Sequence, residues 1–143
     1  MFQKILVAFD ESPAAHNSIV YARNLAMLTD AQVVVLHAYS KTPDYLGEPN
    51  LSETIAKKID RANQLVASVI PEFEKNAIPV TVEILEGPAA DAILKVAAVR
   101  NVDLIVMGNR GLGSVASVLL GSVSLKVLAH AHAPVMIVHA EED

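Results

Sequence analysis

The residues best suited to chemistry form a glycine-rich stretch towards the carboxyl end of the chain, GNRGLGSVASVLLGSVS. Gly108 is followed after two residues by Gly111 and then by Gly113. Nine residues separate Gly111 from Gly121, and Ser122 directly follows Gly121. Glycine accepts positive φ angles, and its missing side chain lets an anion approach the backbone closely. This spacing therefore predicts a segment whose backbone N–H groups converge on an anion such as a phosphate.

The start of the next predicted helix, residues 121–130, strengthens this anion site. Gly121 and Ser122 open that helix, whose N–H groups and positive dipole end attract negative charge. The hydroxyls of Ser122 and Ser124 are candidate hydrogen-bond donors, and Arg110 is a candidate positive charge. Together they indicate a site for phosphate groups.

On spacing alone, the stretch also fits a flexible loop with one glycine at a turn and another at a helix boundary. It lacks the Gly-Lys-Ser/Thr of the Walker P-loop. The Rossmann fingerprint belongs to the first strand-to-helix turn, far from this position. The choice between an anion site and a plain loop depends on the elements around it.

Those elements alternate between strands and helices along the whole chain. Apolar runs predict strands at residues 5–9, 32–38, 80–85, 103–107 and 134–139. Neither of the first two runs alternates polar with apolar residues, which is typical of strands covered on both faces in a parallel sheet. The alternation predicts one domain over residues 1–143, an open five-stranded parallel sheet with helices on both faces.

Local signals predict where some of the helices begin and break. Ser12 followed by Pro13 is typical of a helix start, with a hydroxyl cap and proline at the first helical position. Asn50, with Glu53 three residues later, predicts a capping box for the second helix. Pro71 lies inside that helical pattern and is expected to kink or split it.

The strand order decides which loops can share a ligand site. In open parallel sheets, ligands bind beyond the carboxyl ends of the strands, where the winding reverses. The orders 2-1-3-4-5 and 3-2-1-4-5 both fit the alternation. The glycines after the fourth strand favour 3-2-1-4-5, in which Asp10 and Gly108 face each other across the crevice.

Asp10, at the end of the first strand, has two possible roles. It fits a catalytic or metal-binding carboxylate, or a simple turn residue before the helix. A phospho-receiver domain would need an aspartate after the third strand and a lysine after the fifth. The third strand ends in Glu86 and the fifth runs into Ala140. That class of protein is therefore excluded.

Composition limits the function further. Hydrophobic residues make up 52% and charged residues 19%, so a disordered chain is not expected. The net charge of −5 argues against binding nucleic acid. The chain has no cysteine, no apolar run near membrane-spanning length and no signal-peptide core at its start. We therefore expect a cytoplasmic protein that does not enter a membrane.

Motif, opening and ending together resemble a known family. The chain is similar to the universal stress proteins, in the branch whose ATP motif is G-x2-G-x9-G-[S/T]; Gly108, Gly111, Gly121 and Ser122 match every fixed position. The opening ILVAFDESPAA resembles the family's first strand and acidic turn, and VLAHAHAPVMIVHA resembles its last helix and strand. The resemblance covers nearly the whole chain and implies a fold like that of the adenine nucleotide alpha-hydrolases.

The resemblance also implies roles for individual residues. Asp10 would lie near the ribose or adenine, Ala38 would hydrogen-bond adenine through its backbone, and Ala8 and Met107 would line the pocket. Ribose and phosphates would be held, largely through backbone groups, by Gly108, Gly111, Gly121, Ser122, Val123 and Ser124. The family often binds a divalent cation such as Mg²⁺ with ATP. It commonly dimerises by pairing its last strand, here between Val135 and His139.

We therefore expect an ATP-binding regulatory module that acts in a stress response through an unidentified protein partner, with no catalytic residues assigned. The alternative is a slow ATPase or an AMP-binding enzyme of the same fold. Residues 112–120 contain no lysine or arginine, which leaves Arg110 as the nearby cation. AMP or ADP is therefore also a candidate ligand.

Overall fold

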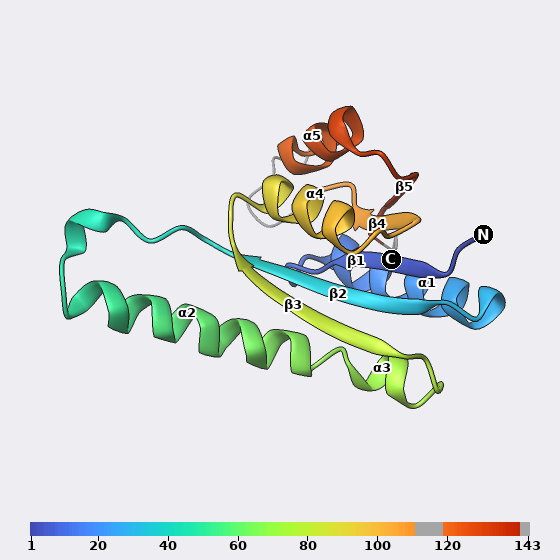
Figure 1. The fold of residues 1–143 in the computed structure, drawn as a ribbon, viewed down its shortest axis with the longest axis horizontal. Helices are drawn as coiled ribbons and strands as arrows, with labels where there is room; N and C mark the ends of the chain where they lie inside the picture. Colours follow the sequence, from blue (N-terminus) through green and yellow to red (C-terminus); the bar gives the residue numbers. More distant parts are fainter. Residues whose placement is uncertain (111–118, 141–143) are drawn as a thin grey trace.

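The computed structural model of this 143-residue chain describes residues 1–110 and 119–140. Strands and helices alternate through these residues (Figure 1). In chain order the elements are β1 (Lys4–Ala8), α1 (Pro13–Thr29), β2 (Gln32–Tyr39), the short 3-10 helix η1 (Asp44–Leu46), α2 (Asn50–Ala67), α3 (Pro71–Glu74), β3 (Val80–Glu86), α4 (Ala89–Val99), β4 (Leu104–Gly108), α5 (Ser122–His130) and β5 (Val135–Val138).

The five strands form one parallel sheet in the order β3-β2-β1-β4-β5, which confirms the predicted order 3-2-1-4-5. Ile5 in the middle of the sheet pairs with Val33 on one side and Leu104 on the other. The chain first builds outward from β1 through β2 to β3, and then crosses to β4 on the other side of β1. The winding therefore reverses between β1 and β4, at the end of the sheet where both strands finish.

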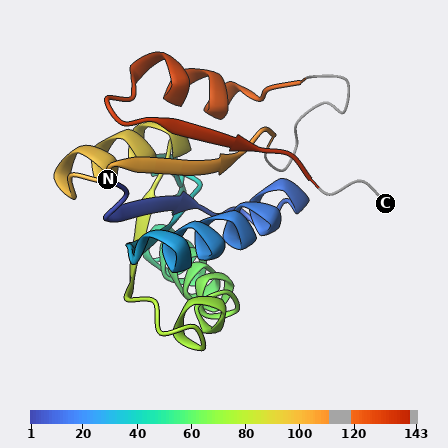
Figure 2. The ribbon, with the colours of Figure 1, turned by 90° about the vertical axis from the view of Figure 1, so that its right-hand side faces the viewer.

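Helices cover both faces of the sheet, as predicted. The helices α4 and α5 lie on one face, and α1, α2 and α3 lie on the other (Figure 2). Successive residues of a strand point to opposite faces. In β1, Ile5 and Val7 accordingly join the core beneath α1, while Leu6 joins the core beneath α4 and α5. Two apolar cores thus hold the central strands from both sides.

The helix starts agree with the sequence in one case and differ in another. The hydroxyl of Ser12 accepts the N–H of Ala15 at 3.2 Å, which confirms the cap of α1. The predicted capping box at Asn50 is wrong, because α2 already begins at Asn50 and Pro49 occupies the cap position. The nearby hydroxyl of Ser52 donates instead to the carboxylate of Glu48.

Proline divides the second helical segment as predicted. The helix α2 ends at Ala67, and α3 begins at Pro71. Proline has no N–H to donate to the preceding turn and its ring crowds that turn, so the helix restarts there. The short α3 then contributes Phe73, which is fully buried beneath the sheet.

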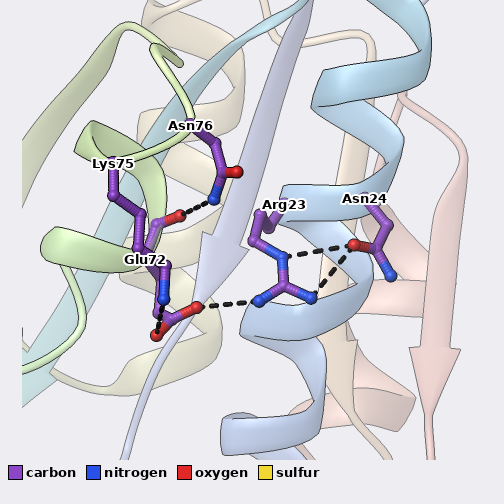
Figure 3. A network of polar contacts seen from close by, with 5 residues as sticks. All are labelled: Arg23, Asn24, Glu72, Lys75 and Asn76. Carbon is purple, nitrogen blue, oxygen red and sulfur yellow. Dashed lines mark hydrogen bonds and ion pairs between the residues drawn. The ribbon is translucent and has the colours of Figure 1, made fainter.

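A polar network joins α1 to α3 across the edge of this layer (Figure 3). A guanidinium nitrogen of Arg23 lies 2.8 Å from one carboxylate oxygen of Glu72, and the ammonium of Lys75 lies 3.0 Å from the other. Arg23 also donates to the side chain of Asn24. The hydrogen bonds from Lys75 and then Arg23 hold the pKa of Glu72 below its ordinary value.

Among residues 1–110 and 119–140, no helix has both the length and the apolar character needed to cross a bilayer.

The network predicts a pH-dependent contribution to stability. The pKa of Glu72 is lowered in the folded state, so its contribution is complete above the unfolded-state pKa and is lost as pH falls through the folded-state value. We expect Glu72→Gln to lower the free energy of unfolding at neutral pH by less than about 1 kcal/mol, since the carboxylate is partly exposed. Urea unfolding at a series of pH values measures this.

The difference between wild type and Glu72→Gln should shrink in acid, below the ordinary carboxyl pKa. Glu74→Gln, on the same short helix, is the matched control and should leave the pH profile unchanged. If wild type and Glu72→Gln still differ in their free energy of unfolding when the Glu72 carboxyl of the wild type is protonated, the effect is not electrostatic.

Candidate functional site

A cavity opens where the winding of the sheet reverses, at the carboxyl ends of β1, β2 and β4 and beside the first turns of α1, α4 and α5. It is lined by Ala8, Phe9, Asp10, Ser12, Ala15, Leu36, Ala38, Ala89, Ile93, Met107, Gly108, Arg110, Val123 and Ser124. Its position is the one at which open parallel sheets bind ligands.

One part of the cavity is apolar and built from small or flexible side chains. Ala8 and Ala38 come from neighbouring strands, and Met107 comes from β4. Leu36 and Ile93 belong to the core beneath α4 and α5, which continues into this wall. An apolar group suits such a slot, since pockets for small organic ligands are mostly apolar with few polar groups.

The turn after β1 contributes polar groups to the remaining part of the cavity. A carboxylate oxygen of Asp10 accepts the N–H of Ser12 at 3.0 Å. Between them, Glu11 has a φ of 69°, a left-handed conformation that a non-glycine residue adopts at some energetic cost. The Glu11 carboxylate forms an ion pair with Arg61 of α2 at 3.1 Å. Asp10 therefore sits in a turn with a defined, strained backbone.

Gly108 is needed for close packing and not for an unusual backbone. A Cβ at this position would lie 2.7 Å from the Cβ of Ala14 and 3.2 Å from the backbone N of Ala15, so the end of β4 touches the start of α1. Among the described glycines only Gly47 has a positive φ, and Gly121 has φ −78° and ψ 169°. The expectation that positive φ explains Gly108 and Gly121 is therefore wrong.

The first turn of α5 borders the cavity. Gly121 caps the helix, and the first intrahelical bond runs from the N–H of Leu125 to the Gly121 carbonyl at 3.0 Å. The N–H groups of Ser122, Val123 and Ser124 precede that bond, so the helix itself supplies no acceptor for them. The N–H of Gly121 donates to the carbonyl of Asn109 at 2.7 Å.

Ser124 is held by the end of β4. The residue is 2% exposed, and its hydroxyl lies within hydrogen-bond distance of two backbone carbonyls, those of Gly108 at 3.0 Å and Asn109 at 3.1 Å. Its one hydrogen is therefore directed at the end of β4.

The structure brings most of the predicted site residues together. The predicted residues that line the cavity are Ala8, Asp10, Ala38, Met107, Gly108, Arg110, Val123 and Ser124. Gly121 and Ser122 are outside this lining but directly precede Val123 at the start of α5. Gly111 and Gly113 lie outside the described residues.

Sequence reasoning missed two kinds of residue. The first is the apolar wall, including Leu36 and Ile93, which resembles ordinary core in the sequence. The second is Asn109, which is 4% exposed and bonds to three separate segments of the chain. Its place inside the GNRG of the glycine motif was the available signal.

Comparison with known proteins agrees with the fold and the family resemblance. Residues 1–139 match the sequence model of the Universal stress protein family. This chain belongs to that family. A universal stress protein of Thermus aquaticus is 41% identical over 141 residues, covering 96% of this chain and 99% of the relative. Another, from Methanocaldococcus jannaschii, is 30% identical over 144 residues, covering 96% of this chain and 82% of the relative.

Solved structures share the architecture of this universal stress protein. One, a hypothetical protein solved for a structure-based assignment of its biochemical function, has a TM-score of 0.91 and 26% identity, and the match covers 100% of this chain and 99% of the other. More distant family structures include an Arabidopsis thaliana protein with AMP bound (TM-score 0.74, 19% identity, coverage 99% and 94%). An Archaeoglobus fulgidus protein in complex with dAMP has a TM-score of 0.71 and 22% identity, with coverage of 96% and 99%.

The contact at Gly108 predicts a large effect from one methyl group. Gly108→Ala should lower the free energy of unfolding by about 1–3 kcal/mol, because the added Cβ must push the start of α1 away from β4. Urea unfolding of the ligand-free protein measures this. Combining it with Ala14→Gly removes the closest clashing atom, so the double variant should lose less stability than the two single losses added together. Strict additivity would show that the two residues do not press on each other.

Proposed function

We propose that this universal stress protein binds an adenine nucleotide, ATP foremost, at the cavity between Asp10 and Gly108, and that binding serves regulation in a stress response. The observation that carries the proposal is the cavity itself. It joins an apolar slot to the amino end of a helix at the point where the sheet reverses its winding. An adenine ring and a phosphate chain need these two environments side by side.

The assignment of the two halves follows from their chemistry. The slot between Ala8, Ala38 and Met107 suits the flat base, with the backbone at Ala38 available along its edge. The first turn of α5 suits the phosphates, since its N–H groups and dipole attract anions. Arg110 adds a positive charge to the lining. Asp10, on the opposite side, would meet the ribose.

Nucleotide-bound family structures support an adenine nucleotide in particular. Besides the proteins with AMP and with dAMP, a universal stress protein has been solved in complex with cAMP. AMP and ADP are therefore alternative ligands for this chain. Arg110 is the one cation among the described lining residues.

Mg²⁺ fits the site through Asp10. Magnesium is usually held by one or two carboxylates together with the phosphates of its ligand, and Asp10 places a carboxylate in the cavity lining. The ion would neutralise part of the phosphate charge. Asp10 would share in holding the ion while its turn, bonded to Ser12, keeps the carboxylate in place.

We favour regulation over fast catalysis because of what the lining offers. Hydrolysis requires a group that positions water and cations that neutralise developing charge. The described lining is mostly apolar, and the Ser124 hydroxyl is already engaged with backbone carbonyls. A bound nucleotide would instead order the surface around the cavity, and a cytoplasmic protein partner would recognise that surface. A slow ATPase is the alternative.

A charge placed at the start of α5 separates phosphate binding from folding. Ser122 is exposed in the first turn, which carries no acidic residue. Ser122→Glu should keep or slightly raise the melting temperature, because a negative charge is favourable at a helix amino end. It should weaken ATP binding about tenfold or more, since about 1.4 kcal/mol of repulsion between nearby charges suffices. Titration calorimetry with ATP and a thermal melt measure the two effects.

The neutral Ser122→Gln is the matched control and should bind ATP nearly as the wild type does. Adenosine, which has no phosphate, should bind both variants equally. Equal ATP affinity in Ser122→Glu and Ser122→Gln would place the phosphates elsewhere, and no binding of any adenine nucleotide to the wild type would refute the function. Turnover of ATP above about 1 s⁻¹ would favour the enzyme alternative.

We also propose that two copies pair through β5, which lies at one edge of the sheet. The carbonyls of Pro134 and Val138 accept hydrogen bonds from the β4 side, so the intervening Val135 and Ile137 direct their backbone groups outward. An edge strand with outward backbone groups is a template for pairing with another strand. A second copy would satisfy these groups.

The edge predicts opposite outcomes for two substitutions at one position. Ile137→Pro removes an outward N–H and should yield a monomer, whereas Ile137→Ala shortens the side chain but keeps the N–H and should remain dimeric. Light scattering with thermal melts measures mass and folding. A wild-type monomer at high concentration, or a folded dimer in Ile137→Pro, would rule out pairing through this edge.

A further inference from the structure

Among the described residues, hydrogen bonds from three donors join the two ends of the glycine-rich stretch. The side-chain amide of Asn109 donates to the carbonyl of Leu119 at 3.0 Å. The N–H of Gly121 donates to the carbonyl of Asn109 at 2.7 Å. The hydroxyl of Ser124 lies within hydrogen-bond distance of the carbonyls of Gly108 and Asn109. We call Asn109 and Ser124, with these bonds, the brace.

Burial makes these bonds important for the arrangement of the chain. Asn109 is 4% exposed and Ser124 is 2% exposed, so water cannot readily replace a lost partner. A buried polar group left without a partner carries a substantial energetic penalty. The brace therefore resists separation of the end of β4 from the start of α5.

The brace is also anchored to the sheet. The backbone N–H of Asn109 donates to the carbonyl of Val138 at 2.9 Å, extending the pairing of β4 with β5 by one residue. Asn109 therefore uses its N–H for the sheet, its carbonyl for α5 and its side chain for Leu119. The first turn of α5 is thereby fixed relative to β4 and β5.

We propose that Asn109 and Ser124 are positioning residues that hold the first turn of α5 beside the cavity before any ligand arrives. Their polar groups act through the backbone of neighbouring residues and do not contact the phosphates. The proposal rests on the proposed function for its purpose, which is a preformed place for the phosphates. The arrangement itself exists in the ligand-free protein and can be tested there.

This role differs from direct contact in what it predicts without nucleotide. If the Ser124 hydroxyl braces the chain, its removal loosens the ligand-free protein locally. If the hydroxyl instead contacts a phosphate, its removal leaves the ligand-free protein unchanged and weakens binding alone. Amide hydrogen exchange reports such local opening at single residues.

The test compares amide exchange in ligand-free wild type, Ser124→Ala and Ser124→Thr. In Ser124→Ala, the Gly121 amide should exchange at least tenfold faster. Its acceptor, the Asn109 carbonyl, loses the contact with the Ser124 hydroxyl that helps to hold it in place. Ser124→Thr keeps the hydroxyl and should retain most of the protection. The Val33 amide, bonded to Pro79 in a remote part of the sheet, should be unchanged in both variants.

Unchanged exchange at Gly121 in a folded Ser124→Ala would overturn the proposal. If that variant fails to fold, Ser124→Val, which matches the shape of threonine but has no donor, replaces it, and unchanged exchange there has the same meaning. ATP titration of the same proteins tests the purpose separately. If Ser124→Ala shows faster exchange and at least tenfold weaker ATP binding, both proposals are supported. If it shows faster exchange but even the wild type binds no nucleotide, the brace is supported and the nucleotide function is refuted.

Discussion

The contact between Gly108 and Ala14 is the constraint on which the rest of the site depends. It brings the carboxyl end of β4 against the amino end of α1 with no room for another atom. Since α1 begins at that contact, the turn from Asp10 to Ser12 must connect β1 to a helix whose position is already set. The left-handed backbone of Glu11 is the form that this short connection takes.

Much of the fold could be predicted because its signals are local and agree with one another. The uninterrupted apolar runs predicted parallel strands. Ser12 marked a helix boundary through its capping hydroxyl, and Pro71 did so because it has no backbone N–H. The Asn50 cap failed because the same residue types serve several purposes near a helix start. Here a serine hydroxyl bonded to Glu48 and the helix began one residue earlier than the pattern required.

The site was predictable in its position and less so in its physics. Strand order and glycine spacing led to the end of the sheet where the cavity lies, but the glycine argument named conformation where packing is the cause at Gly108. Asn109 and Ser124 could not be interpreted from sequence because their partners lie ten or more residues away or on another strand. A short polar side chain carries no local sign of which distant carbonyl it will meet.

The joined ends of the glycine-rich stretch have an evolutionary consequence. Because Asn109 is bonded to both Leu119 and Gly121, the chain leaves β4 and enters α5 at nearly one place. The position of α5 relative to the strands is therefore set by a few bonded residues at the two ends. Substitutions outside these residues need not move that frame, so proteins with one architecture can differ in what they recognise.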